Sequence, residues 1–141
     1  MLYRGDGMKN RILIIDDDNE ISNMIADYLG KNGYETHIAN DGIRGIKYVI
    51  EKKPDLIILD IMLRYKSGDE ILREVREFSD IPIIVVSAKE NVQFKVDLFK
   101  IGVDDYVVKP FDLLELLARI ETNLRRYLKL TSQQTLYKHK T

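Results

Sequence analysis

The 141-residue sequence contains no cysteine and no tryptophan, and it has only three prolines. Without cysteine there is no disulfide framework, no thiolate metal site and no cysteine nucleophile. No apolar run approaches the roughly 18 residues of a membrane span, and residues 1–10 lack the apolar stretch of a signal peptide. The net charge of −1 gives no general reason to expect nucleic-acid binding. These absences favour a soluble, cytoplasmic protein with no membrane partner.

Five short apolar runs, rich in β-branched residues, alternate with five stretches in which apolar residues recur at helical spacing. This alternation predicts an α/β fold, a doubly wound parallel sheet with helices on both faces. The run at 56–59 is apolar at every position, which is typical of a strand buried on both faces. The expected strands are 11–15, 36–39, 56–59, 83–86 and 104–108, and the expected helices are about 21–29, 43–50, 71–78, 91–101 and 113–129.

Polar side chains stand where four of these strands are expected to end. They are Asp16 and Asp17 after the first strand, Asp60 after the third, Ser87 after the fourth and Lys109 after the fifth. The carboxyl ends of parallel strands lie along one edge of a doubly wound sheet, and such sheets bind their ligands there. We therefore expect these carboxylates, the hydroxyl and the ammonium to converge.

This set of groups suits one kind of chemistry. Crowded carboxylates repel one another and need a counter-charge, which a hard divalent cation with oxygen ligands supplies. Mg²⁺ held by one or two carboxylates is typical of phosphoryl transfer, in which the protein mainly positions reactants and neutralises charge. An aspartate can be the nucleophile and give an aspartyl phosphate. Lys109 and Ser87 would then donate to the phosphoryl oxygens.

Each of these residues also has a purely structural interpretation. Asp18 precedes a helix and is expected to be its N-cap, and Asp16 and Asp17 suit a solvated acidic turn. Ser87 suits a cap of the following helix, and Lys109 can be an exposed lysine like most others. For any single residue this interpretation is at least as strong as function. Four strand ends that together carry the groups for one reaction favour function.

The motifs resemble those of the receiver domains of bacterial two-component response regulators, over about residues 9–129. The resemblance implies a flavodoxin-like fold, in which five parallel strands in the order 2-1-3-4-5 are flanked by five helices. Each motif is weak alone, but four in this order are specific. They are Asp16-Asp17-Asp18, then Leu59-Asp60-Ile61-Met62-Leu63 followed by Gly68, then Val86-Ser87-Ala88-Lys89, and finally Asp104-Asp105-Tyr106-Val107-Val108-Lys109-Pro110-Phe111.

The resemblance implies specific roles at the strand ends. Asp60 would accept the phosphoryl group from the phosphohistidine of a sensor histidine kinase. Lys109 would bind a phosphoryl oxygen, with a cis bond to the proline that follows. Mg²⁺ would be held by Asp60, by Asp17, by Asp16 partly through water, and by the Met62 carbonyl. The domain would catalyse only its own phosphorylation and dephosphorylation, and so would be a switch and not a turnover enzyme.

Two further residues would report the phosphorylation. Ser87 would be the switch hydroxyl that moves toward the phosphoryl group, and Tyr106 would be its aromatic partner, turning inward. Met62, two residues after Asp60, cannot orient an attacking water, and Lys89 could shield the phosphoryl group. We therefore expect slow self-dephosphorylation.

The segment 63–68 departs from the family, whose members often carry Leu-Pro-Gly after this strand. It reads Leu-Arg-Tyr-Lys-Ser-Gly here, and without the proline the loop is less constrained. Its shape and its contacts with a kinase are therefore not fixed by the resemblance.

Residues 104–111 resemble the subfamily whose effector is a winged-helix DNA-binding domain. In that subfamily, phosphorylation promotes a symmetric homodimer through the fourth helix, the fifth strand and the fifth helix. The fourth helix here has more apolar residues than one core-facing stripe requires, which predicts an exposed apolar patch centred on Val96, Phe99 and Leu117. The alternative is scattered surface residues and intramolecular ion pairs worth ~0–1 kcal/mol each. Candidate ion pairs across the dimer are Lys95 with Glu115, and Asp104 or Asp105 with Arg119.

We expect residues 1–8 to be a disordered leader, 9–130 the receiver domain, and 131–141 a linker toward an effector domain outside these residues. DNA would be bound only through that domain. One competing function is a Mg²⁺-dependent phosphatase with an aspartate nucleophile, since residues 16–18 satisfy Asp-x-Asp. However, no Thr or Val follows in the usual place after this motif, and 141 residues leave no cap domain. Another is a flavin-binding flavodoxin-type domain, but the acidic run after the first strand would repel the flavin phosphate.

Overall fold

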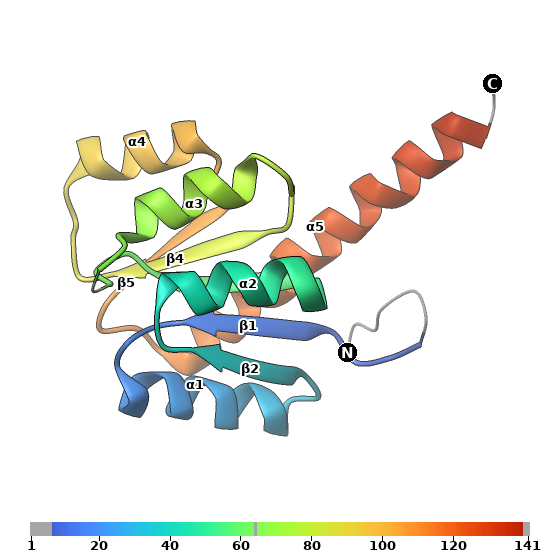
Figure 1. Ribbon diagram of the computed structural model, residues 1–141. Coiled ribbons are helices and arrows are strands. Elements are labelled where there is room, and N and C mark those ends of the chain that lie inside the picture. Colours follow the sequence, from blue (N-terminus) through green and yellow to red (C-terminus); the bar gives the residue numbers. More distant parts are fainter. Residues whose placement is uncertain (1–6, 64, 140–141) are drawn as a thin grey trace.

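A computed structural model describes residues 7–63 and 65–139, and the side chains of these residues up to 129. Its centre is a five-stranded parallel sheet in the order β2-β1-β3-β4-β5 (Figure 1). The doubly wound, flavodoxin-like fold and its strand order are therefore confirmed. The strands are β1 (Arg11–Ile15), β2 (Glu35–Ala39), β3 (Leu56–Asp60), β4 (Ile83–Ser87) and β5 (Asp105–Val108).

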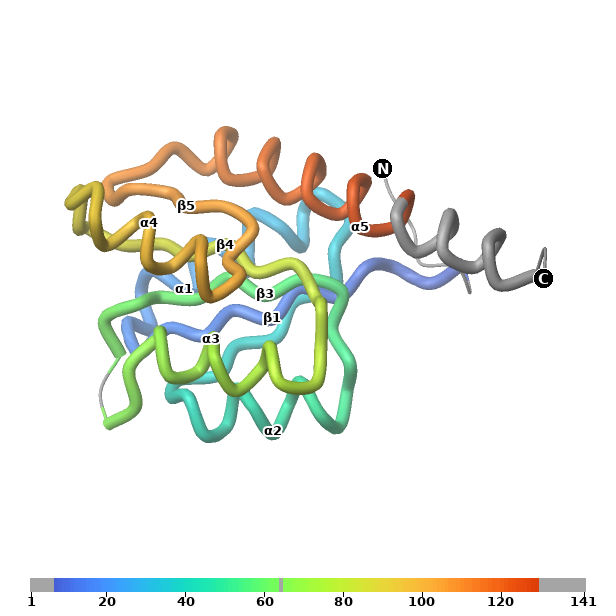
Figure 2. Tube along the Cα trace, turned by 90° about the horizontal axis from the view of Figure 1, so that it is seen from above, coloured from blue at the N-terminus to red at the C-terminus, as the bar shows by residue number. Residues whose placement is uncertain are grey.

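Helices cover both faces of the sheet, as the alternation predicted. Successive residues of a strand point to opposite faces, so Ile12 and Ile14 pack with α1 and α5, whereas Leu13 and Ile15 pack with α2, α3 and α4. Figure 2 shows α2 and α3 on the side of the sheet away from α5. The helices are α1 (Asn19–Lys31), α2 (Gly42–Lys52), α3 (Gly68–Arg76), α4 (Val92–Ile101) and α5 (Leu113–His139).

Two of the inner strands, β3 and β4, are buried at every position, including their polar last residues Asp60 and Ser87. An apolar run can form such a strand because both of its faces meet helices and both of its edges meet other strands. The sheet therefore holds Asp60 and Ser87 on buried strands that cannot move freely.

The expected N-cap is observed for α1 but not for α4. Asp18 is the N-cap of α1, where its Oδ1 accepts from the Glu20 and Ile21 amides at 3.0 and 3.2 Å. The N-cap of α4 is Asn91, whose Oδ1 accepts from the Phe94 amide at 3.0 Å. Ser87 is therefore not the cap of α4, and the structural interpretation of this hydroxyl is wrong.

The last helix continues past its expected end near residue 129, because α5 runs to His139. Residues 130–139 contain no glycine or proline, the residues that most often end a helix, which explains why the helix is not interrupted. The role of 131–141 as a linker stays a prediction.

Most of the expected leader, residues 1–6, lies outside the described part of the chain. None of the helices in 7–63 and 65–139 combines the length and the apolar character of a membrane span.

Candidate functional site

Three carboxylates meet at the carboxyl edge of the sheet, to which the strand arrows point in Figure 1. Asp16 and Asp17 follow β1, and Asp60 ends the neighbouring strand β3. One carboxylate oxygen from each lies within 4.8 Å of the other two. Asp16 is 3% and Asp60 is 5% exposed, so two of the three charges are largely removed from water.

Asp60 has defined hydrogen-bond partners on both of its carboxylate oxygens. Its Oδ1 accepts from the Met62 amide at 3.0 Å, and its Oδ2 lies 3.4 Å from the Lys109 ammonium. Lys109 directly follows β5, its amide donates to the Ser87 carbonyl at 2.8 Å, and its bond to Pro110 is cis as expected. The structure thus brings residues from the ends of β1, β3 and β5 into one group.

Burial raises the pKa of Asp16 to about 6, and the charge of Asp60 acts in the same direction. The Asp18 amide, which donates to Asp16 Oδ1 at 2.9 Å, and the charge of Lys109 oppose this increase. Three carboxylates lie beside one ammonium, so the group carries more carboxylate than positive charge. Oxygen ligands with surplus negative charge are the donors that Mg²⁺ prefers, so the residues present fit this ion.

The two expected switch residues are connected through the main chain of Lys89. Ser87 is fully buried, and its Oγ accepts from the Lys89 amide at 3.1 Å. The Tyr106 hydroxyl donates to the Lys89 carbonyl at 2.7 Å, and Tyr106 is 8% exposed, with its ring on the core side. Sequence reasoning missed this link because backbone groups carry no residue-type signal.

Two lysines lie against aromatic rings beside this link. The Lys89 ammonium is 4.6 Å from the ring centre of Phe94, and the Lys95 ammonium is 5.2 Å from that of Tyr106. Both are distances at which a cation is attracted to an aromatic face. The contact with Phe94 gives the Lys89 side chain a position on α4, and its shielding of a phosphoryl group stays a prediction.

The loop after β3 is held at its ends. The Gly68 amide donates to the Ile61 carbonyl at 3.2 Å, and a Cβ at Gly68 would lie 2.6 Å from Ile61 Cα, so only glycine fits there. Lys66 forms an ion pair with Glu74 of α3. Met62 is 59% exposed, and the role of its carbonyl as a metal ligand stays a prediction. Position 64 of this loop lies outside the described residues.

The expected apolar patch is present in part. Val96 and Phe99 of α4 are 40% and 49% exposed, in agreement with the sequence. The prediction for Leu117 is wrong, because this side chain is only 8% exposed and packs in the core with Leu116 and Ile120. The core-facing stripe of α5 is wide enough to include position 117, one residue after Leu116 and three before Ile120.

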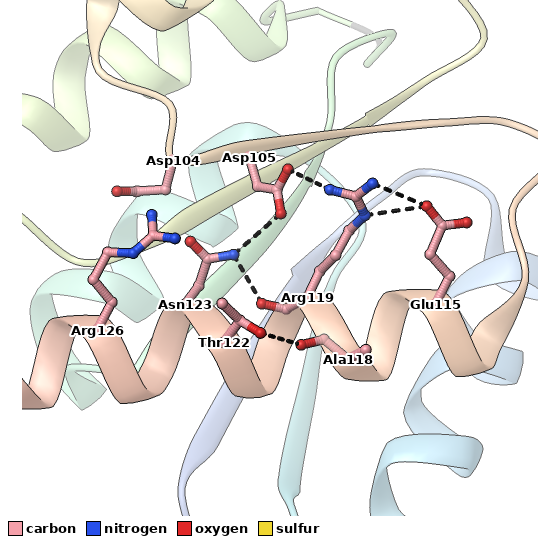
Figure 3. Close-up of a pocket in the computed structure, with 8 residues that line it drawn as sticks. All are labelled: Asp104, Asp105, Glu115, Ala118, Arg119, Thr122, Asn123 and Arg126. Carbon is pink, nitrogen blue, oxygen red and sulfur yellow. Dashed lines mark hydrogen bonds and ion pairs between the residues drawn. The ribbon is translucent and has the colours of Figure 1, made fainter.

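Several charged residues of this face form ion pairs within one chain, and Figure 3 shows those of Arg119. Arg119 binds Asp105 at 2.9 Å and Glu115 at 3.1 Å, and all three line an open pocket of about 480 Å³. Asp104 pairs with Arg76 at 2.9 Å. In the single chain these residues therefore form intramolecular ion pairs, as the alternative interpretation expected. Exchange of these partners in a dimer stays a prediction.

Sequence reasoning missed Asn123, which is buried beside this pocket. Its Nδ2 donates to Asp105 Oδ2 at 3.2 Å and to the Arg119 carbonyl at 2.8 Å. A lone asparagine within an otherwise regular helix gives no signal of this contact.

A five-stranded sheet of this order, with an acidic cluster and a lysine at its carboxyl edge, defines the class of CheY-like receiver domains. The chain belongs to the response regulator receiver domain family, whose family model matches residues 12–121. The protein is therefore the receiver domain of a response regulator, a family of phosphoacceptor domains that bind Mg²⁺ in an acidic pocket and act with histidine kinases.

Solved structures of receiver domains agree with this assignment. The receiver domain of Francisella response regulator 1452 is 31% identical, with a TM-score of 0.81, and the match covers 84% of this chain and 99% of that one. A CheY-like receiver domain from Methanospirillum hungatei is 29% identical, with a TM-score of 0.82 and coverages of 86% and 98%. The BeF3-activated N-terminal receiver domain of Klebsiella pneumoniae RstA is 33% identical, with a TM-score of 0.79 and coverages of 82% and 99%.

Proposed function

We propose that this receiver domain is cytoplasmic and accepts a phosphoryl group on Asp60 from a sensor histidine kinase, in a Mg²⁺-dependent reaction. The observation that carries the proposal is the position of Asp60, which lies within 4.8 Å of Asp16 and Asp17 and 3.4 Å from Lys109. A buried carboxylate with both a cation site and an ammonium beside it is suited to receive a phosphoryl group.

In the transfer, a carboxylate oxygen of Asp60 attacks phosphorus while the bond from phosphorus to the histidine nitrogen breaks. Lys109 donates to one phosphoryl oxygen. The Ser87 hydroxyl, at the end of the neighbouring strand β4, donates to another. Asp16, Asp17, Asp60 and the Met62 carbonyl would hold Mg²⁺, which would neutralise charge on the phosphoryl group. The domain processes no external substrate in turnover, and it acts as a switch.

The switch would use the main chain of Lys89. Movement of Ser87 toward a phosphoryl group displaces the Lys89 amide that donates to Ser87 Oγ, and the Lys89 carbonyl is the acceptor of the Tyr106 hydroxyl. A change at Asp60 would therefore reach β5 through two hydrogen bonds, and α4 through the Lys89 ammonium on the Phe94 ring.

The output would be a homodimer formed through α4, β5 and α5. Val96 and Phe99 supply exposed apolar surface, and the rim carries both signs of charge. Exchange of partners between two chains would pair Lys95 with Glu115, and Asp104 or Asp105 with Arg119. We further propose that dimerisation controls transcription through a C-terminal DNA-binding domain of the winged-helix subfamily, for which the likeness to an N-terminal receiver domain is support.

The test is incubation with Mg²⁺ and acetyl phosphate or phosphoramidate, followed by intact mass. We expect one phosphoryl adduct that is absent in Asp60→Asn and absent when EDTA removes the metal. Asp69→Asn, a partly exposed aspartate in the first turn of α3, is the matched control and should keep the adduct. Rapid donor turnover without any adduct would instead favour the aspartate phosphatase.

A further inference from the structure

The middle of helix α4 has few buried side chains that attach it to the core. Leu98 is its one fully buried residue, whereas Val92, Val96 and Phe99 are exposed. Buried apolar area is what attaches a helix to a core, so α4 depends on the contacts at its two ends. These ends are held by different kinds of contact.

One guanidinium ties the C-terminal end of α4 to α3 and to the segments that precede β4 and β5. Arg76, at the end of α3, donates from Nε to the Gly102 carbonyl at 2.9 Å and from Nη1 to the Ser79 carbonyl at 3.1 Å. Its Nη2 donates to Asp104 Oδ2 at 2.9 Å, and that oxygen also accepts from the Ile83 amide at 2.8 Å. The Arg76 side chain is only 16% exposed.

These contacts are strong and specific to their geometry. Hydrogen bonds from a charged group are roughly twice as strong as neutral ones, and the planar guanidinium fits three acceptors in fixed directions. Gly102 has φ of +119°, and a Cβ there would lie 3.1 Å from Arg76 Nε, so glycine admits the close approach. Ile83 is the first residue of β4, so this anchor lies at the sheet edge opposite Asp60.

The N-terminal end of α4 is held instead by contacts next to the phosphoacceptor. The Lys89 amide binds Ser87, the Lys89 carbonyl binds Tyr106, and the Lys89 ammonium lies on Phe94. Each of these three contacts is a single interaction, and two of them involve the expected switch residues Ser87 and Tyr106.

From this asymmetry we propose that Arg76 fixes the C-terminal end of α4, so that phosphorylation moves the helix at its N-terminal end about this anchor. The inference rests on the proposed function, because it assumes that Asp60 is phosphorylated. It assigns to Arg76 a positioning role in the switch, although Arg76 touches no group of the phosphoacceptor site.

Hydrogen exchange on the full chain, with Mg²⁺ and with or without acetyl phosphate, tests this directly. The Phe94 and Lys95 amides, which bind Asn91, report the N-terminal end, and the Gly102 and Val103 amides, which bind Leu98, report the C-terminal end. On phosphorylation we expect exchange at the first pair to change about tenfold and at the second pair less than about twofold.

Arg76→Gln should make exchange at Gly102 and Val103 about tenfold faster before phosphorylation, because the three acceptors lose their charged donor. Phosphorylation should then change both ends. Arg73→Gln, an exposed arginine on the same helix, is the control and should match the wild type. If Arg76→Gln fails to fold by circular dichroism, Arg76→Lys keeps the charge but cannot reach three acceptors, and it should give a smaller change in the same direction.

Two results would overturn the inference alone. One is an adduct on Asp60 with equal changes at both ends of wild-type α4, and the other is a folded Arg76 variant whose Gly102 and Val103 amides are unaffected. Absence of any adduct on Asp60 would overturn the proposed function as well, so the two failures are distinguishable.

Discussion

At the scale of single residues, Lys109 forms an ion pair with Asp60, with 3.4 Å between Nζ and Oδ2. Lys109→Gln removes this charge while it keeps a hydrogen-bond donor of similar length. We expect adduct formation from acetyl phosphate to slow by about tenfold or more, because charge that develops on the phosphoryl oxygens loses its ammonium. A time course by intact mass measures this. Lys100→Gln, on an exposed lysine of α4, should leave the rate unchanged, and an unchanged rate in Lys109→Gln would contradict the assigned role.

Two buried tyrosines allow a matched pair of stability measurements. The Tyr34 hydroxyl has no hydrogen-bond partner among the described residues, and burial raises the pKa of Tyr34 to about 12. Tyr34→Phe should therefore leave the free energy of unfolding unchanged or raise it by up to ~1 kcal/mol, equally at pH 6 and pH 9 because the hydroxyl is neutral at both. Tyr106→Phe loses the bond to the Lys89 carbonyl and should cost ~1 kcal/mol. Urea denaturation checks both, and the opposite order would show that the hydroxyl contacts are misassigned.

Met62 bears on how long a phosphoryl group persists. Its side chain is 59% exposed, so a polar replacement buries no unsatisfied group. Met62→Asn should speed loss of the phosphoryl group severalfold, because an amide can orient the attacking water whereas a thioether cannot. The decay of the adduct after donor removal measures this, with Met8→Asn, also 59% exposed, as the control. Unchanged or slower decay in Met62→Asn would refute the expectation.

At the scale of elements, an apolar pocket of about 420 Å³ lies beside the site, between α1 and the segment after β5. Met24 of α1 lines it and is 48% exposed, and Lys109 lines it from the other side. Because Lys109 contacts Asp60, we expect a protein phosphodonor to touch this surface, whereas a small donor need not. Met24→Glu should therefore slow transfer from a phosphorylated histidine kinase at least about tenfold, by placing a charge in an apolar contact, and leave the rate with acetyl phosphate unchanged. Equal effects on both donors would mean that the change disturbs the site itself.

The elements also show how far sequence alone reaches. Apolar runs that stop at Asp60 and Ser87 predicted the strands and the polar residues at their ends, because a buried strand needs apolar residues until it leaves the sheet. The end of α5 was missed because nothing in 130–139 stops a helix, and a missing apolar face is not a stop signal. The exposure of Leu117 was predicted wrongly because two adjacent leucines do not show which of them faces the core. The role of Lys89 was missed because its amide and carbonyl make the contacts.

At the scale of the whole molecule, the proposed dimer depends on α4. Phe99→Glu places a charge on the exposed patch and should abolish the shift to a dimer on size exclusion after phosphorylation, with the adduct on Asp60 unaffected. Phe78→Glu is a close control, because Phe78 is 51% exposed against 49% for Phe99 and follows α3, outside α4, β5 and α5. A phosphorylated Phe99→Glu protein that still dimerises would exclude this face.

Helix α5 runs without a break from Leu113 to His139, so the rotational position of its last residue relative to the sheet is fixed. Each residue of an α-helix advances 1.5 Å and turns about 100°. The distance and the direction of any segment joined after residue 139 would therefore be set by the position of α5 on the sheet. One residue added within 130–139 would turn that heading by about 100°. Register along this helix, and not only pairing of two domains, would then decide how two attached partners face one another.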